Sequence, residues 1–179
     1  MILKQTLVHS SKLMGALSAC ALSLTLSLTT HALEVGSEAP CVVLEQIQTD
    51  GQLTEGCIRD RLAPNTQSFT VIDFSSIYCS YCEQSLPALA ELTSEIADTA
   101  TVRKVIIDRN RDAVLKYLEQ KSDLTVYPVA LDTDRDAKKA YQVTATPTLF
   151  VLNAQNQIVY KHIGLLDRNT VRDIKRAVR

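Results

Sequence analysis

Two cysteines three residues apart, Cys79 and Cys82, stand between an apolar segment and a helical segment. The preceding stretch, 69–75, reads Phe-Thr-Val-Ile-Asp-Phe-Ser and predicts a buried strand, whereas 83–92 carries leucines at helical spacing. Thiols at this spacing can close a small disulfide ring and reopen it. The N-terminus of a helix favours a thiolate, so Cys79 is predicted to be the nucleophile of the pair.

The rest of the chain alternates between apolar and amphipathic stretches, without repeats or linkers after residue 33. The expected strands are 41–44, 53–58, 69–75, 102–108, 126–131, 148–152 and 158–162. The expected helices are 83–97, 112–121, 134–141 and 169–178. This order predicts an α/β fold with a mixed central sheet and helices on both faces. In such a sheet the reactive loop lies at the carboxyl end of a central strand, where Cys79 is found.

The N-terminal segment has the pattern of a secretory signal. Lys4 and Lys12 precede an uncharged apolar run at 13–28, and small residues at a cleavage position end at Ala32. We therefore expect a signal peptide that is removed on export to the periplasm.

That boundary divides the chain into a signal peptide at 1–32 and one domain at 33–179. Two alternatives stay open: lipidation at Cys20, and an uncleaved anchor that leaves the domain facing the periplasm. Loss of Lys4 and Lys12 leaves 17 basic residues (19 minus 2) against 20 acidic ones, a formal charge of −3. This balance favours neither nucleic acid nor an anionic membrane surface as a partner.

The expected domain retains four cysteines but a single histidine, His162. One histidine argues against a multi-histidine metal site, and no metal or organic cofactor is expected. The hairpin predicted around Thr49-Asp-Gly-Gln52 places Cys41 and Cys57 on adjacent strands. They are predicted to form a structural disulfide; a second exchangeable pair is the alternative.

Two further features accompany the cysteine pair. Asp73 lies in the strand before it, where a buried carboxyl could exchange a proton with the thiol of Cys82. Pro147 follows Thr146 at the start of another strand, where a cis bond would turn the backbone of Thr146 outward to pair with a substrate strand.

These motifs together resemble the thioredoxin superfamily. The residues that carry the resemblance are Asp73-Phe-x-x-x-x-Cys-x-x-Cys82, Pro87 five residues later, and Thr146-Pro-Thr-Leu-Phe-Val-Leu152. The N-terminal hairpin after Gly36-Ser-Glu-Ala-Pro40 and the inserted strand–helix–strand passage containing 127–135 are similar to the TlpA/ResA group of exported thiol–disulfide oxidoreductases. The resemblance implies a thioredoxin-like fold with an N-terminal β-hairpin and a central βα insertion.

The chain departs from the group's pattern beside the cysteines. Tyr78 replaces a usual Trp, Ser80-Tyr81 replaces Gly-Pro or Glu-Pro, and Ser85 stands where many members carry Glu. Tyr78 and Tyr81 would contact a partner or shield the disulfide.

The resemblance implies a reductant of protein disulfides that is recharged by a membrane thiol–disulfide carrier, with cytochrome c maturation as a candidate process. Three alternatives stay open: a disulfide oxidase or isomerase, a thiol peroxidase, and a copper-binding module. Ser76 only partly imitates the Thr-x-x-Cys pattern of peroxidases, and the copper-binding motif has one more residue between its cysteines.

Overall fold

The computed structural model describes residues 33–63, 66–121 and 126–179; the expected signal peptide lies outside them. The strands are β1 (Val43–Ile47), β2 (Leu53–Cys57), β3 (Phe69–Ser75), β4 (Ala100–Ile106), β5 (Val129–Leu131), β6 (Thr148–Leu152) and β7 (Ile158–Ile163). The helices are α1 (Ser80–Glu95), α2 (Arg111–Glu119), α3 (Asp136–Ala140) and α4 (Arg168–Ala177). No helix in these described ranges is both long and apolar enough to cross a bilayer.

The seven strands form one mixed sheet in the order β2-β1-β5-β4-β3-β6-β7. The central strands β3, β4 and β5 run parallel to one another, and α1 and α2 make the crossovers between them. Antiparallel hairpins close the sheet at both edges. Strands β3 and β4 are buried almost throughout, as expected for parallel strands covered on both faces. The predicted order of elements and the α/β class are therefore confirmed.

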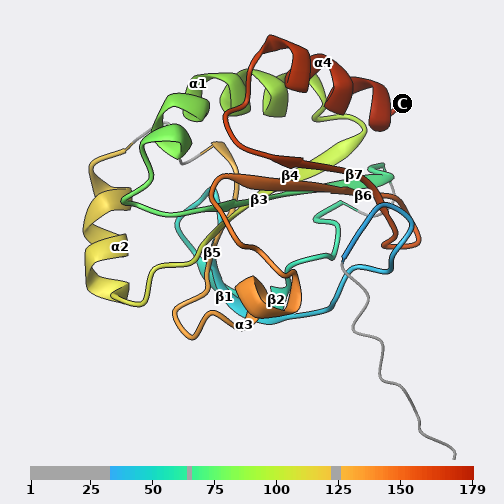
Figure 1. Cartoon of the computed structure of the whole chain (residues 1–179). Helices are drawn as coiled ribbons and strands as arrows, with labels where there is room; N and C mark the ends of the chain where they lie inside the picture. Colours follow the sequence, from blue (N-terminus) through green and yellow to red (C-terminus); the bar gives the residue numbers. More distant parts are fainter. Residues whose placement is uncertain (1–32, 64–65, 122–125) are drawn as a thin grey trace, which may run out of the picture. The chain divides into compact units, whose positions relative to one another are not determined.

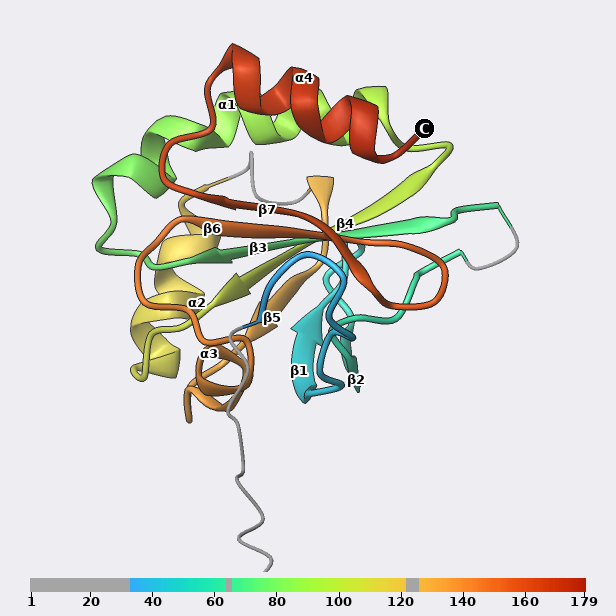
Figure 2. The same cartoon turned by 45° about the vertical axis from the view of Figure 1, so that its right-hand side comes forward.

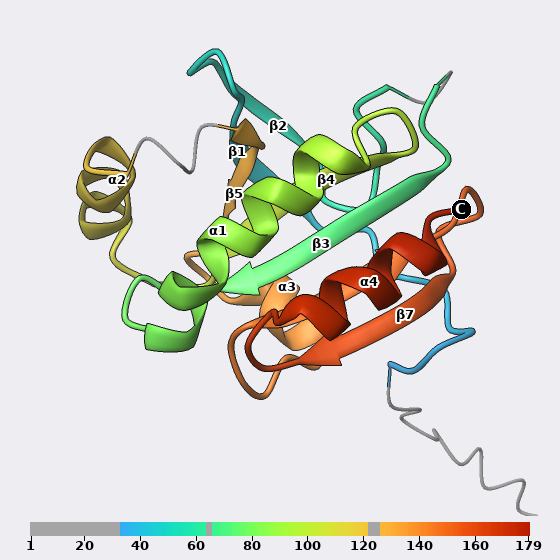
Figure 3. The ribbon, with the colours of Figure 1, turned by 90° about the horizontal axis from the view of Figure 1, so that it is seen from above.

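The helices divide between the two faces of the sheet. Helices α1 and α4 lie side by side over β3 and β7 (Figures 1 and 3), and α3 lies beneath the sheet (Figure 2). Helix α2 contributes Val114 to a small cluster with Ile106, Val129 and Leu131.

Alternation along β3 supplies both halves of the core. Val71 packs with Leu86, Leu89 and Leu92 of α1. Its neighbours Ile72 and Phe74 point to the opposite face, towards α3. There, Phe74, Tyr141 and Phe150 form a triangle of rings whose centroids lie 5.1, 5.9 and 5.4 Å apart. Because Asp73 falls between Val71 and Ser75, its side chain lies on the α1 face.

The N-terminal hairpin turns at Gly51, whose φ of 81° lies in the left-handed region that glycine adopts without strain. The predicted start of the first strand is wrong: Cys41 precedes β1, which begins at Val43, opposite Cys57 of β2. The ladder ends there because the chain turns after Cys57, where the amide of Asp60 donates to the carbonyl of Cys57 at 3.0 Å. Cys41 and Cys57 nevertheless form a disulfide, with 5.4 Å between Cα atoms.

A buried arginine supports the segment that follows β2. Arg103 of β4 donates to the backbone carbonyls of Cys57, Ile58 and Asp60. Burial lowers the pKa of its guanidinium to about 10. The three carbonyl dipoles replace the water that would otherwise solvate the guanidinium. The buried charge of Arg103 is therefore stable only while the segment after β2 keeps its position.

Removal of the Cys41–Cys57 disulfide tests its structural role. Cys41→Ala/Cys57→Ala is expected to lower the free energy of unfolding by about 3 kcal/mol, since the unfolded chain loses a cross-link over 16 residues. Urea denaturation of the two proteins, each with Cys79–Cys82 oxidised, measures the difference. Equal unfolding midpoints would contradict a structural role.

Candidate active site

The cysteine pair lies where β3 gives way to α1. Cys79 is the N-cap of α1: its backbone is extended, and its Sγ accepts a hydrogen bond from the amide of Cys82 at 3.1 Å. This amide is one of the helix-terminal donors that lack a partner within the helix. The structure holds the pair as a disulfide, with 5.2 Å between the Cα atoms. In the reduced form the same amide and the helix dipole would stabilise a thiolate on Cys79.

The two sulfurs differ in access to solvent. Cys79 is half-buried, whereas Cys82 lies inside the first turn of α1 with 4% of its surface exposed. A protein disulfide can therefore approach Cys79 but not Cys82. This asymmetry agrees with the predicted roles of nucleophile and resolving thiol.

The loop before β6 brings a second segment to Cys79. The Thr146–Pro147 peptide bond is cis, as predicted, and the carbonyl oxygen of Thr146 lies 3.3 Å from Cys79 Sγ. The amide of Gly164 donates to the carbonyl of Pro147 at 2.9 Å and ties this loop to the end of β7. The backbone of Thr146 is thus held beside Cys79 Sγ.

Asp73 does not stand alone in the core. The β3–β4 register places Lys104 directly opposite it, and the Lys104 ammonium forms an ion pair with Asp73 Oδ2. Both side chains are 3% exposed, and no hydrogen bond reaches Oδ1 from any described residue. Lys104 also lies 5.9 Å from the centroid of the Tyr127 ring. Sequence reasoning missed Lys104, because its position within an apolar strand gave no sign of its partner.

Asp108 holds the loop that leads to Cys79. It follows β4 and is buried; its carboxylate accepts from the Ser76 hydroxyl at 2.9 Å and the Ile77 amide at 2.8 Å. These bonds fix the two residues after β3, so the start of α1 has a set position. Asp108 was also missed, although an acid directly after a buried strand, at the edge where the reactive loop lies, was a usable signal.

The start of α1 is joined to two other elements. The buried hydroxyl of Ser85 donates to the carbonyl of Tyr81 at 2.7 Å and accepts from the amide of Leu166 at 3.1 Å. Ser85 therefore hydrogen-bonds the start of α1 to the segment before α4.

Glu83 makes the contact to α2. It accepts from the Tyr117 hydroxyl at 2.8 Å and pairs with Lys121. The hydrogen bonds from Lys121 and Tyr117 hold the pKa of Glu83 below its ordinary value of 4.5. Burial, with the neighbouring carboxylate of Glu83, raises the pKa of Tyr117 above its ordinary range.

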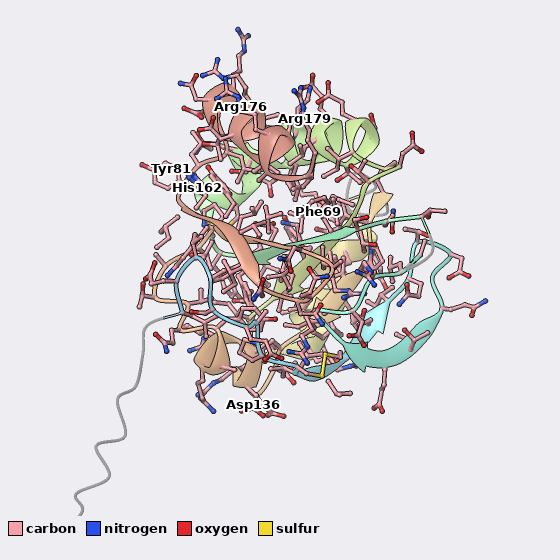
Figure 4. All side chains as sticks on the ribbon, turned by 90° about the vertical axis from the view of Figure 1, so that its right-hand side faces the viewer. Phe69, Tyr81, Asp136, His162, Arg176 and Arg179 are labelled. Carbon is pink, nitrogen blue, oxygen red and sulfur yellow. A yellow bond between two sulfur atoms is a disulfide. The ribbon has the colours of Figure 1, made fainter. Side chains whose placement is uncertain are left out.

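Aromatic side chains stand exposed around the pair. Tyr78 is 78% exposed and Tyr81 57% exposed, on either side of Cys79 in sequence. Figure 4 labels Tyr81 together with His162 of β7, whose Nε2 lies 3.1 Å from the carbonyl oxygen of Leu165. Exposure of this extent leaves both tyrosines free to meet a partner.

No three His, Cys, Asp or Glu side chains within the described parts of the chain are grouped as a metal site requires. The Cys41–Cys57 disulfide belongs to the N-terminal hairpin at the far edge of the sheet from β7. Counted along the strand order, β1 is separated from β3 by β4 and β5, so the two cysteine pairs are distinct sites.

The fold and this site define a thioredoxin-fold protein with a Cys-x-x-Cys redox centre. The sequence profile of the Redoxin family matches residues 34–178. The chain belongs to the Redoxin family. Within the thioredoxin superfamily it is a TlpA/ResA-like thiol–disulfide oxidoreductase, as its motifs predict.

Relatives and solved structures agree with this assignment. Thiol-disulfide oxidoreductase ResA of Bacillus subtilis (strain 168) is 27% identical over 158 residues, 86% of this chain and 83% of ResA. The crystal structure of a putative thiol:disulfide interchange protein DsbE from Chlorobium tepidum has a TM-score of 0.65 and 22% identity, covering 82% of this chain and 96% of that one. The mitochondrial 2-Cys peroxiredoxin of Plasmodium falciparum has a TM-score of 0.64 and 12% identity, over 80% and 93% of the two chains. The likeness to these two solved structures shows the fold alone.

The buried ion pair gives a test of its energetics. Lys104→Met is expected to lower the free energy of unfolding by about 3–5 kcal/mol, because it leaves the carboxylate of Asp73 buried without its cation. Asp73→Asn/Lys104→Met removes both charges, and its free energy of unfolding is expected to fall by less than that of Lys104→Met. Denaturant unfolding of the four proteins of this cycle gives the coupling, and a double variant less stable than Lys104→Met would contradict the explanation.

The contact between Glu83 and α2 predicts a pH dependence. A lowered pKa in the folded state means that ionised Glu83 adds stability at pH values above 4.5, and that this stability is lost as pH falls through the lowered pKa. Glu83→Gln is expected to flatten the acid limb of the stability curve below about pH 5 and to leave its neutral region parallel to that of the parent. Thermal unfolding between pH 3 and 7 measures this, with Glu91→Gln on the same helix as control.

Proposed function

We propose that this protein is an exported reductant of protein disulfides that acts through Cys79 and Cys82. The observation that carries the proposal is the arrangement around Cys79: a half-buried sulfur at a helix N-terminus, beside the Thr146 carbonyl and above a buried Cys82. This arrangement offers one sulfur to a partner and keeps the second for the intramolecular step.

The reaction proceeds in two exchanges. The Cys79 thiolate attacks one sulfur of the substrate disulfide, forms a mixed disulfide and releases the other substrate sulfur as a thiolate. The Cys82 thiolate then attacks Cys79 Sγ, closes the Cys79–Cys82 disulfide and releases the second substrate thiolate. Two electrons pass from the protein to the substrate, whose two thiolates take up protons. A dithiol donor restores the reduced pair by the reverse steps.

Asp73 is the proposed acceptor of the proton that Cys82 must lose. The α1 face of β3, to which Asp73 points, also receives the buried first turn of α1 with Cys82. The unbonded Oδ1 provides a lone pair, and Lys104 balances the charge of the carboxylate. The backbone of Thr146–Pro147 would hold the substrate chain, with Tyr78 and Tyr81 contacting it from the exposed side.

Location and partners follow from the sequence pattern and from family resemblance. We propose that residues 1–32 direct export to the periplasm and that 33–179 act there, free or held at the membrane through an anchor or a lipid on Cys20. A membrane thiol–disulfide carrier is the proposed electron donor. Cysteine-bearing exported proteins are the proposed substrates, c-type apocytochromes among them, as resemblance to the TlpA/ResA group implies.

A thiol peroxidase remains an alternative, because the fold also resembles that of a 2-Cys peroxiredoxin. The hydroxyl of Ser76 would have to assist Cys79 in that reaction. In the structure this hydroxyl donates to Asp108 and accepts from the amide of Tyr78 at 3.2 Å, so it is already engaged. Disulfide exchange is the better-supported function.

Insulin reduction with dithiothreitol as donor tests the proposal. Cys79→Ala is expected to abolish the protein's contribution to the rate, because among the described cysteines Cys82 is buried and Cys41 is paired with Cys57. Reduced Cys82→Ala, mixed with insulin after dithiothreitol has been removed, is expected to accumulate a mixed disulfide with the substrate, seen as a mass increase that added dithiothreitol reverses.

Cys41→Ala/Cys57→Ala serves as the matched control and should retain activity. Full activity of Cys79→Ala would refute the assignment of the nucleophile. Rapid consumption of hydrogen peroxide without any protein disulfide substrate would favour the peroxidase instead.

A further inference from the structure

A groove lined by cations opens at the carboxyl ends of β4 and β5. It has a volume of about 370 Å³ and is lined by Arg109, Arg135, Lys138 and Lys139, together with Val143 and Thr144. We refer to it as the basic groove. A second groove, of about 390 Å³, adjoins it and shares Arg109.

The basic groove lies between the two segments that flank Cys79. Arg109 directly follows Asp108, whose carboxylate holds the loop leading to the cysteine. At the other side, Thr144 stands two residues before Thr146, whose carbonyl lies beside Cys79 Sγ. An extended substrate chain advances about 3.3 Å per residue, so one that pairs with Thr146 reaches the basic groove within a few residues of its reactive cysteine.

The charge of the groove is not balanced by its own walls. Four of its lining side chains are cationic and none is acidic. Lys139 pairs with Asp136 at 3.1 Å, and Arg135 Nε donates to the carbonyl of Ile107 at 3.2 Å. Arg109 and Lys138 have no side-chain hydrogen bond or ion pair to any residue in the described parts of the chain.

Three acids lie nearby. Asp134 lines the adjoining groove with Arg109, but its carboxylate forms no ion pair with a described residue. The carboxylate of Asp132 is buried and accepts from the amides of Ala137 and Lys138 at the start of α3. Glu45 is engaged by Arg111 of the adjoining groove, at 2.7 and 3.1 Å. The sequence carries one more acidic than basic residue, so the positive charge of the groove does not arise from a net positive charge of the chain.

We propose that the basic groove receives an acidic segment of the protein substrate, so that Asp or Glu residues near the reactive cysteine select the partners of Cys79. This inference rests on the disulfide exchange proposed above. The planar forks of Arg109 and Arg135 match carboxylates, and the ammonium of Lys138 adds a point charge. Attraction of this kind acts chiefly on the rate of encounter and is screened by salt.

Two synthetic peptide disulfides test the inference with the reduced full-length chain. They differ only in the residues beside the cysteine, which are aspartate and glutamate in one peptide and serine and glycine in the other. At low ionic strength the acidic peptide is expected to react about tenfold faster than the neutral one. The ratio of the two second-order rate constants should approach one at about 0.5 M salt.

Charge reversal identifies the residues responsible. Arg109→Glu/Lys138→Glu is expected to lower the acidic-to-neutral ratio about tenfold. Lys138→Glu alone, which leaves the neighbour of Asp108 intact, should lower it in the same direction. The matched control is Arg176→Glu/Arg179→Glu, which changes the net charge equally. Arg176 lies on α4 and Arg179 follows the end of that helix, across the molecule from Asp136 of α3 (Figure 4), and their replacement should preserve the ratio.

Equal rate constants for the two peptides in the parent protein would overturn the inference, while a measurable reaction with the neutral peptide would still support disulfide exchange. A control variant that lowers the ratio as much as the groove variant would overturn it as well, since net charge would then explain the preference. Binding to phosphatidylglycerol vesicles that is lost in the groove variant, with the peptide ratio unchanged, would assign the groove to a lipid surface. Failure of Cys79 to react with either peptide would refute the proposed function itself.

Discussion

The register of β3 against β4 determines the position of almost every group around Cys79. Because Asp73 pairs with Lys104, a carboxylate and an ammonium meet inside the core beneath α1. Two residues beyond β4, Asp108 reaches the loop after β3 and holds Ser76 and Ile77. A shift of one residue would turn Asp73 to the opposite face and separate both pairs, so the parallel pairing of these two buried strands underlies the geometry of the site.

The residues that stabilise the fold around β3 and β4 are different from those beside Cys79. The apolar cores on the two faces of the sheet hold α1 and α3 in place, whereas the reactive sulfur lies at the end of β3, where the chain leaves the sheet. Contacts from three directions then converge on the N-terminal part of α1 and its cap: Thr146 beside Cys79, Leu166 on Ser85, and Tyr117 on Glu83. An oxidoreductase that exchanges disulfides with other proteins needs this combination of a rigid support and an accessible sulfur.

Most of the fold could be predicted from periodicity and turn chemistry. Alternation in β3 and the leucines of α1 identified their buried faces, and Asp50-Gly51 identified the first hairpin. The boundaries were less predictable: β1 begins after Cys41, and β5 is confined to Val129–Leu131 rather than starting at Val126. A strand ends where its neighbour no longer provides hydrogen-bond partners. The pairing register that decides this cannot be derived from the sequence of the strand alone.

The sequence by itself determined the chemistry of the site. The spacing of Cys79 and Cys82 at the start of a helix predicted the disulfide that they form, and Pro147 before a strand predicted the cis bond, because spacing and local conformation are encoded within a few residues. Only the tertiary structure determined which charged side chains lie around the cysteine pair. Lys104, Asp108 and the cations of the basic groove come from strands and loops far apart in the chain, and long-range pairing alone brings them to Cys79.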